Sequence, residues 1–286
     1  MQILRLIDTG GTIGMVPSEQ GLVPGAGVVE QHLRAALPQG TALDVVTFDP
    51  LIDSANIRPA DWNRLADLID EHDGPVLITH GTDTLGFSAA ALSQVIAPER
   101  AVVLCAAMQP LGQNADAEES LAQALEYLLS GRAGVRVAVN GQILEAEGVT
   151  KTDSHARAAF VSVPQAPPAP RATGARFGTG PQIGVLTLTP GLSGQALAAL
   201  LGCFDGVVLR IYGAGTFPED PALVTAVAEA VARGLPVRVV SQCVQGGLAP
   251  GLYAAGASFW QSGVTNGGTE TVELAFVRLL LAASAA

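Results

Sequence analysis

The chain is poor in charged residues, in aromatic residues and in lysine. Asp, Glu, Lys and Arg make up 14% of its 286 residues and the aromatic residues 5%, whereas 49% are hydrophobic. A chain with few charges and a large apolar fraction can bury a core, which excludes an intrinsically disordered protein. The 26 acidic residues outnumber the 15 basic ones and give a formal net charge of −11. This balance excludes nucleic acid and anionic membranes as main partners, because both attract basic patches.

Cysteine is also scarce, and no long hydrophobic run is present. Cys105, Cys203 and Cys243 include no closely spaced pair, so we expect reduced thiols. We expect no secretory signal at the start of the chain, since the first predicted strand reaches Asp8 at once. Charged residues interrupt the longest apolar stretches, which excludes a membrane span. We therefore expect a protein of the reducing cytoplasm.

Short apolar segments alternate with amphipathic segments along the first half of the chain, as strands and helices do in α/β domains. Strands are predicted at residues 3–7, 43–48, 76–79, 101–105 and 135–139, and helices at 28–37, 59–72, 85–96 and 118–129. Because such alternation produces a parallel sheet with helices on both faces, we predict that layered arrangement here.

A segment rich in proline and glycine, residues 164–182, interrupts this pattern and predicts a linker of extended chain. Beyond it, strands are predicted at residues 183–188, 206–211 and 236–241, and helices at 193–201, 221–233 and 271–282. The predicted fold class is α/β, with two α/β domains of mainly parallel sheets. Residues 1–163 form the larger N-terminal domain and residues 183–286 the smaller C-terminal domain.

Glycine and hydroxyl residues follow two of the predicted strands, in the loops 8–14 and 80–84. Ligands of open α/β sheets bind beyond the carboxyl ends of strands, so these loops are candidates for an active site. Adjacent glycines permit a tight turn that brings backbone N–H groups close to a ligand. The alternatives are an ordinary turn or phosphate cradle for the first loop and a helix cap for the second. The first loop lacks the spacing of the nucleotide-binding motifs.

Lys151 is the only lysine, whereas arginine occurs fourteen times. An amine can lose its proton when it is partly buried or lies near other cations, and a guanidinium cannot. A single amine retained in a polar loop is what proton transfer requires, so Lys151 is a candidate catalytic base. The alternative is a surface lysine without a role.

The histidines and cysteines do not indicate a metal site. His32, His72, His80 and His155 show no metal-ligand spacing with cysteines or carboxylates. No dinucleotide or other cofactor motif is recognisable either. We therefore expect neither a metal nor a cofactor.

Taken together, these loops resemble a known enzyme family. Thr9-Gly10-Gly11-Thr12-Ile13 and His80-Gly81-Thr82-Asp83-Thr84 resemble the two signature loops of the bacterial-type L-asparaginase family. Lys151 resembles the catalytic lysine of that family. Residues 18–21, 50–54, 59–62 and 209–213 are similar to segments of its cytoplasmic type I branch. The resemblance covers nearly the whole chain.

The resemblance implies hydrolysis of L-asparagine to L-aspartate and ammonia through a covalent acyl-enzyme. Thr12 is then the nucleophile, and Thr82, Asp83 and Lys151 form a supporting relay. Such a mechanism is chemically coherent, because a hydroxyl is a weak nucleophile until a base takes its proton. The family also implies a homodimer or homotetramer.

The same resemblance assigns the substrate contacts. Backbone N–H groups of the glycine turns, at Gly11 and Gly81, would hold the developing oxyanion. Ser54 and Asp83 would bind the α-carboxylate and α-amino groups of the substrate.

Two positions depart from the family pattern. The family places an activating tyrosine in the loop after the first strand, where this chain has Leu22. Thr216 stands where many relatives have an asparagine. Type I enzymes can also carry a regulatory asparagine site, and its positions match Arg210, Ser241 and Cys243.

Two other functions remain as alternatives. Leu22 motivates a binding or sensing module that holds asparagine without turnover, or with weak activity. An ammonia-releasing component of an amidotransferase is the other alternative, although such components carry an extra N-terminal domain that we do not expect here. A preference between asparagine and glutamine does not follow from the sequence.

Overall fold

The computed structural model describes residues 2–19, 21–25, 27–113, 116–166, 170–252 and 256–285. Its contacts divide the chain into two compact units. Unit 1 comprises Met1–Ser162 with Arg171–Gly174, and unit 2 comprises Val163–Pro170 with Ala175–Ala286. Both units are mixed α/β with mainly parallel sheets, which confirms the predicted fold class.

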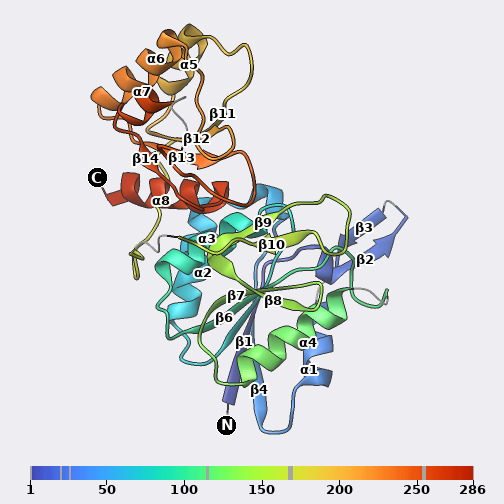
Figure 1. Ribbon diagram of the computed structural model, residues 1–286. Coiled ribbons are helices and arrows are strands. Elements are labelled where there is room, and N and C mark those ends of the chain that lie inside the picture. Colours follow the sequence, from blue (N-terminus) through green and yellow to red (C-terminus); the bar gives the residue numbers. More distant parts are fainter. Residues whose placement is uncertain are drawn as a thin grey trace. The chain divides into compact units, whose positions relative to one another are not determined.

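Unit 1 is built on a six-stranded sheet of strand order β4-β1-β5-β6-β7-β8 (Figure 1). All neighbouring strands are parallel except β7 and β8, which form an antiparallel pair. In that order the strands are β4 (Thr41–Thr47), β1 (Gln2–Asp8), β5 (Val76–Thr79), β6 (Ala101–Cys105), β7 (Gly134–Val139) and β8 (Gln142–Glu145).

Helices cover both faces of this sheet, as a parallel arrangement requires (Figure 1). One face packs against α1 (Val28–Ala36) and α4 (Asp116–Leu129), which share a buried apolar cluster with β1, β5 and β6. The other carries α2 (Pro59–Asp70) and α3 (Leu85–Val95). Ten of the eleven residues of α3 are buried, which explains why small and apolar side chains occupy nearly all of its surface.

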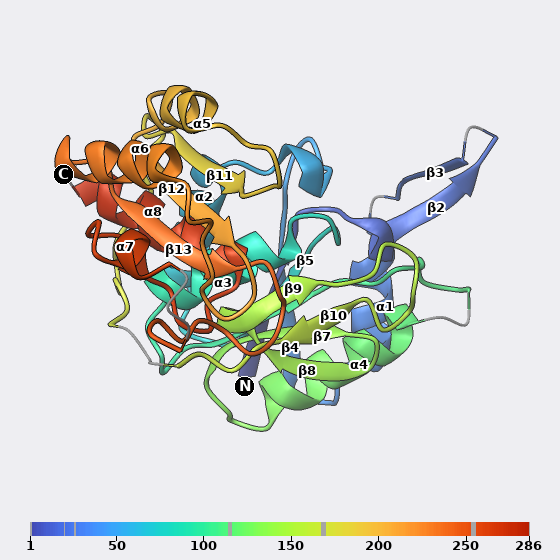
Figure 2. The ribbon, with the colours of Figure 1, turned by 45° about the horizontal axis from the view of Figure 1, so that its top comes forward.

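Two hairpins of unit 1 have no counterpart among the predicted strands. β2 (Met15–Ser18) pairs with β3 (Gly21–Pro24), and this hairpin extends away from the rest of the unit (Figure 2). β9 (Val149–Lys151) pairs with β10 (Phe160–Ser162). Neither hairpin has the continuous apolar stretch that marks a buried strand.

Unit 2 contains a four-stranded parallel sheet of order β11-β12-β13-β14. Its helices α5 and α6 share one apolar cluster with the sheet, and α8 packs against the sheet through a second cluster. The strands are β11 (Ile183–Thr187), β12 (Gly206–Ile211), β13 (Val237–Ser241) and β14 (Thr265–Asn266), and the helices are α5 (Gly194–Leu201), α6 (Pro221–Ala232), α7 (Ala257–Trp260) and α8 (Val272–Ala285).

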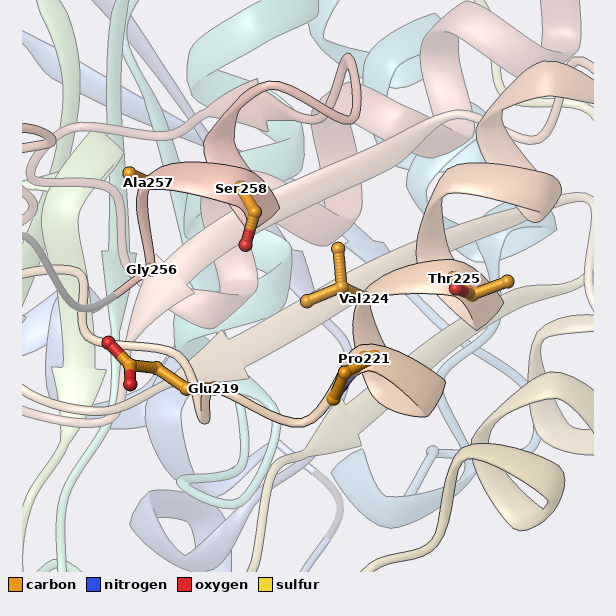
Figure 3. A pocket seen from close by; sticks show the side chains of 7 residues that line it. All are labelled: Glu219, Pro221, Val224, Thr225, Gly256, Ala257 and Ser258. Atoms are coloured by element: carbon orange, nitrogen blue, oxygen red, sulfur yellow. The ribbon is translucent and has the colours of Figure 1, made fainter.

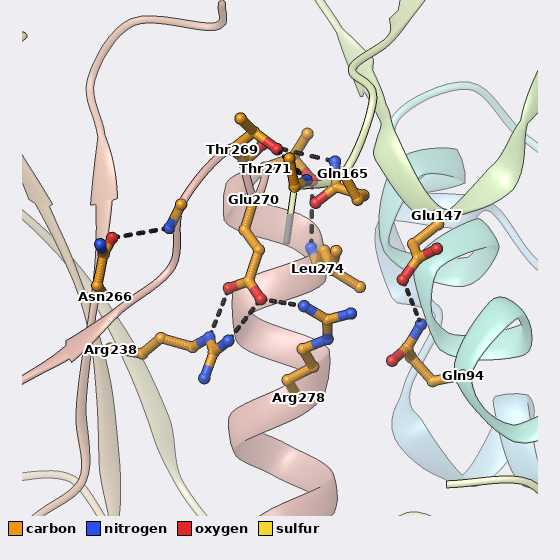
Figure 4. A network of polar contacts seen from close by, with 12 residues as sticks. Gln94, Glu147, Gln165, Arg238, Asn266, Thr269, Glu270, Thr271, Leu274 and Arg278 are labelled. Atoms are coloured by element: carbon orange, nitrogen blue, oxygen red, sulfur yellow. Dashed lines mark hydrogen bonds and ion pairs between the residues drawn. The ribbon is translucent and has the colours of Figure 1, made fainter. Parts of the chain in front are cut away.

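A buried carboxylate links β13 to α8 within unit 2 (Figure 4). Glu270, whose side chain is 4% exposed, accepts two hydrogen bonds of 2.5 Å from the guanidinium of Arg238 in β13. Arg278 in α8 donates to the same carboxylate. A buried carboxylate without such partners would be strongly destabilising, so the two arginines make this position tenable for a glutamate.

The division into units crosses the segment that we predicted as a linker. Thr269, next to Glu270, donates through its hydroxyl to Pro164 O at 2.7 Å and accepts from Ala166 N–H at 2.8 Å, all within unit 2. Gly174 donates to Val95 O at 2.8 Å within unit 1. Pro164 and Ala166 are therefore bound within unit 2 and Gly174 within unit 1, whereas residues 167–169 lie outside the described residues.

None of the helices in the described part of the chain has the length and apolar character that a membrane crossing demands.

Candidate active site

The predicted loops lie at the point where the direction of strand addition reverses in the sheet of unit 1. From β1 the chain adds β4 on one side, and it then continues with β5 on the other side. In open α/β sheets such a switch leaves a crevice beyond the carboxyl ends of the two central strands. Residues 9–12 follow β1 and residues 80–84 follow β5, so both loops lie at the carboxyl ends of these two neighbouring strands.

The two loops contact each other through their backbones. Gly10 and Gly11 have φ angles of +108° and +96°, a region that favours glycine. A Cβ atom on Gly11 would lie 2.5 Å from the carbonyl carbon and oxygen of His80 and 2.6 Å from Gly81 N. Thr12 directly follows Gly11, and Thr82 directly follows Gly81, so this close contact brings the two threonines to the same end of the sheet.

A third segment, residues 48–54, is hydrogen-bonded to the end of β1 and the start of the first loop, and its last residue contacts the second loop. Phe48 N–H donates to Asp8 O at 2.9 Å, and Ile52 N–H donates to Thr9 O at 2.8 Å. At its end lies Ser54, which is buried and whose Oγ accepts from Asp83 N–H at 3.3 Å. A Cβ atom on Gly81 would lie 2.5 Å from Ser54 Oγ. The structure therefore places Ser54 directly against Gly81 and Asp83.

Lys151 reaches the second loop from the last position of β9. Its Nζ donates to Thr82 Oγ1 at 3.0 Å and to Asp83 Oδ1 at 3.0 Å. The Lys151 side chain is 22% exposed and that of Asp83 66%, while Thr82 is buried. The single amine of the chain thus lies between a hydroxyl and a carboxylate, which is an arrangement that can transfer a proton from the hydroxyl.

His80 supports the second loop from within the core. Its imidazole is fully buried, and burial lowers the pKa of His80, so the ring is neutral at neutral pH. Nδ1 donates to Gly81 O at 2.7 Å. Burial, with the negative charge of Asp116 nearby, raises the pKa of the neighbouring Cys105 thiol, which makes Cys105 unreactive.

Leu22 lies on the β2–β3 hairpin, opposite Pro17. Its side chain is 45% exposed and offers no polar atom to a reacting group. The structure thus contains an exposed apolar residue at the position where the family resemblance implies a tyrosine.

The candidate regulatory residues gather at the carboxyl ends of two neighbouring strands of unit 2. Arg210 is in β12, Ser241 ends β13, and Cys243 follows with an exposed free thiol. Ser241 Oγ donates to Gly213 O at 2.7 Å and accepts from Cys243 N–H at 3.0 Å. In the same unit, Thr216 N–H donates to Tyr212 O at 3.0 Å.

Among the described residues no group of three or more His, Cys, Asp or Glu side chains is arranged to hold a metal ion.

Unit 2 also contains an open cavity of about 510 Å³ beside α6 and α7 (Figure 3). None of the predicted site residues lines it. Its lining consists of Glu219, Pro221, Val224, Thr225, Gly256, Ala257 and Ser258.

The sequence did not single out two buried polar residues that lie at the strand ends just before the two loops. Asp8 ends β1 and is 5% exposed, and Thr79 ends β5 and is fully buried. The only sequence feature that marks Thr79 is a hydroxyl at the end of an otherwise apolar strand, which is also a common strand ending.

The contact of Gly11 with the His80 carbonyl yields a stability prediction. In Gly11→Ala the added methyl group meets that carbonyl and cannot avoid it, so we expect a loss of about 3 kcal/mol or more in the free energy of unfolding. Gly40→Ala is the matched control, because Gly40 has φ +87° with open space around it. The control is expected to lose only about 1–2 kcal/mol, the cost of a left-handed backbone. Urea denaturation of both variants measures the difference, and equal losses would contradict the proposed clash.

Comparison with known proteins follows the division of the chain. Residues 3–178 match the family described as asparaginase, N-terminal, and residues 182–286 match the glutaminase/asparaginase C-terminal domain. L-asparaginase 1 of Escherichia coli (strain K12) is 31% identical, over 95% of this chain and 88% of the relative. L-asparaginase of Thermococcus kodakarensis is 32% identical, over 98% of this chain and 92% of the relative.

Comparison with solved structures also finds L-asparaginases. The thermostable L-asparaginase from Thermococcus kodakarensis superimposes with a TM-score of 0.85 and 31% identity, covering 100% of this chain and 94% of the other. L-asparaginase I from Vibrio cholerae superimposes with a TM-score of 0.79 and 29% identity, covering 98% of this chain and 92% of the other.

Proposed function

Because the chain belongs to the asparaginase family, we propose that it hydrolyses L-asparagine to L-aspartate and ammonia through an acyl-enzyme at Thr12. One observation carries the proposal: the only lysine of the chain lies 3.0 Å from both Thr82 Oγ1 and Asp83 Oδ1. These groups stand beside the glycine turn that leads to Thr12. A nucleophile, a base and an orienting carboxylate are the parts that nucleophilic catalysis by a hydroxyl requires.

The proposed reaction has two balanced halves. Thr12 Oγ attacks the carboxamide carbon, and its proton passes through Thr82 to the amine of Lys151, which acts as the base. The tetrahedral intermediate then expels the amide nitrogen, which takes that proton and leaves as ammonia. In the second half, water attacks the ester and gives its proton to the amine. The tetrahedral intermediate then expels the Thr12 oxygen, which takes that proton from the amine, so that aspartate and free Thr12 are released. Backbone N–H groups of the loops stabilise the oxyanion in both halves.

Substrate recognition is assigned to the second and third segments of the site. Asp83 keeps a largely exposed carboxylate, which attracts the α-ammonium group of an amino acid. Ser54 lies between Gly81 and Asp83, where its hydroxyl can donate to the α-carboxylate. A site with both groups favours a small zwitterion over a simple amide.

An ammonia-release assay with asparagine and with glutamine, over a range of concentrations, tests this function. Turnover of free asparagine by the purified chain is expected, and no turnover of either amide would refute the proposal. Tight binding of asparagine without turnover would instead select a sensing module, which the apolar Leu22 favours. Turnover without a second protein would also argue against a component of an amidotransferase.

Assembly is proposed from the family resemblance, and location from the cysteines. We propose a homodimer or homotetramer, as the family resemblance implies, and light scattering of the purified protein tests it. We also propose that the protein acts in a reducing cytoplasm, because Cys105, Cys203 and Cys243 all carry free thiols. Intact disulfides in protein isolated without reductant would contradict that location.

Regulation by asparagine is proposed at Arg210, Ser241 and Cys243. These residues meet at the ends of β12 and β13, where Ser241 Oγ joins Gly213 to Cys243. We expect sigmoidal velocity against asparagine concentration, and hyperbolic velocity in Cys243→Ala. Cys203→Ala, at the other exposed cysteine, is the matched control and should remain sigmoidal. Hyperbolic kinetics in the wild type would refute the proposal.

A further inference from the structure

A buried carboxylate and two threonines join the ends of β1 and β5 directly beneath the candidate site. Asp8 and Thr79 are partners in the register of these parallel strands. Thr79 Oγ1 donates to Asp8 Oδ1 at 2.6 Å. Thr9 completes the network, because its N–H donates to Thr79 Oγ1 at 3.1 Å and its hydroxyl donates to Thr79 O at 2.6 Å.

The network extends into the glycine turn. Asp8 Oδ1 accepts a second hydrogen bond, from Gly10 N–H at 3.1 Å. The backbone of a glycine can adopt φ and ψ angles that other residues avoid, so this bond limits the conformations open to Gly10. A buried polar group without a hydrogen-bond partner costs free energy. Any movement that breaks one bond of this network leaves such a group, so the network resists rearrangement.

We propose that Asp8 and Thr79 are positioning residues for Thr12, an inference that rests on the proposed function. Asp8 fixes the N–H of Gly10, and Gly11 then lies against the His80 carbonyl with no room for a side chain. Thr12 comes next in the chain, so its place relative to the second loop depends on the orientation of Gly10. Thr79 ties the same carboxylate to the strand that leads to Thr82.

The kinetic signature of this role is a loss of kcat with little change of KM. Of the groups assigned to substrate binding, Ser54 lies on the third segment and Asp83 lies four residues beyond Thr79. The hydrogen bond between them is not part of the network, so we expect it to persist when the network is cut. A nucleophile displaced by about 1 Å costs a reaction about 100-fold in rate. A purely structural role would lower stability and the amount of folded protein, but would leave kcat per active site unchanged.

The test compares Thr79→Val with Thr79→Ser. Valine keeps the shape of threonine and removes the hydroxyl, and we expect kcat for asparagine to fall about 10- to 100-fold with KM within about 2-fold. Serine keeps the hydroxyl and is expected to restore kcat to near the wild-type value. Asp8→Asn keeps an oxygen acceptor and should retain more activity than Asp8→Ala.

Tyr127→Phe is the matched control. It removes a buried hydroxyl that donates to Ala133 O. Ala133 directly precedes β7, so this bond lies at the amino-terminal ends of the strands, away from the site. We expect it to lower the urea midpoint without changing kcat. In every variant kcat is referred to the amount of folded protein, which the amplitude of the urea unfolding transition measures.

The outcomes separate this inference from the proposed function. If the wild type releases no ammonia, the proposed function fails and the positioning role fails with it. If the wild type turns over asparagine and Thr79→Val keeps the wild-type kcat per active site, only the positioning role is overturned. Should Asp8→Ala yield no folded protein, the pair at Thr79 decides alone, because Thr79→Ser differs from Thr79→Val in retaining the hydroxyl.

Discussion

Lys151→Arg is expected to lower kcat for asparagine about 100- to 10,000-fold while the protein stays folded. Arginine places a permanent cation beside Asp83 and cannot accept a proton, because a guanidinium does not lose its own in proteins. Proton transfer by a positioned side chain contributes about 10²- to 10⁴-fold to a rate, and this substitution removes it. Steady-state ammonia release measures the loss, and urea denaturation checks that the fold is retained.

The control for this substitution lies on the same hairpin. Arg157, in the turn between β9 and β10, pairs with Glu119, and both side chains are about half exposed. Arg157→Lys makes the opposite exchange at a surface ion pair, which contributes little to stability. We expect it to leave kcat unchanged. Wild-type kcat in Lys151→Arg would show that the amine of Lys151 is not the base.

Thr12→Ala and Thr82→Ala are each expected to abolish ammonia release, with kcat reduced about 10⁴-fold or more. The first removes the proposed nucleophile, and the second removes the hydroxyl that links it to Lys151. Residues that act as a unit give losses that do not add, so the double variant should be no worse than either single one. Thr187→Val, at an exposed strand end in unit 2, is the control and should keep full activity.

Mass spectrometry of enzyme quenched during turnover identifies the acylated residue. An aspartyl group on the peptide that contains Thr12 is the expected result. The same group on the peptide that contains Thr82 would exchange the roles of the two threonines. Full activity in either alanine variant would contradict the mechanism altogether.

The sequence predicted the fold wherever buried apolar segments are regular. Every residue of β5 is buried, and the strand predicted at residues 76–79 has the same bounds as β5. The β2–β3 hairpin was not predicted, because its residues are exposed or only partly buried and show no apolar face. β9 and β10 were missed because three residues are too few to display a period.

The site was predictable in part for a physical reason. Parallel strands end at the same edge of a sheet, so polar loops after two strands can be expected to meet if the strands are neighbours. That β1 and β5 are neighbours depends on the strand order, which local patterns do not contain. The contact between Lys151 and Thr82, and the bond between Asp8 and Thr79, join residues about 70 positions apart and depend on register. Only the resemblance to a family pointed to the first of these, and nothing pointed to the second.

The segment between the two units has a consequence for recombining this protein with its relatives. The chain leaves unit 1 after Ser162, returns to it for Arg171–Gly174, and leaves again. A fragment that ends at Ser162 lacks the hydrogen bond of Gly174 to Val95 and the ion pair of Arg171 with Glu147. A fragment that begins at Ala175 lacks the residues that bind Thr269. A chimera that exchanges one unit for that of a relative therefore needs three matched junctions, where a simple tether would need one.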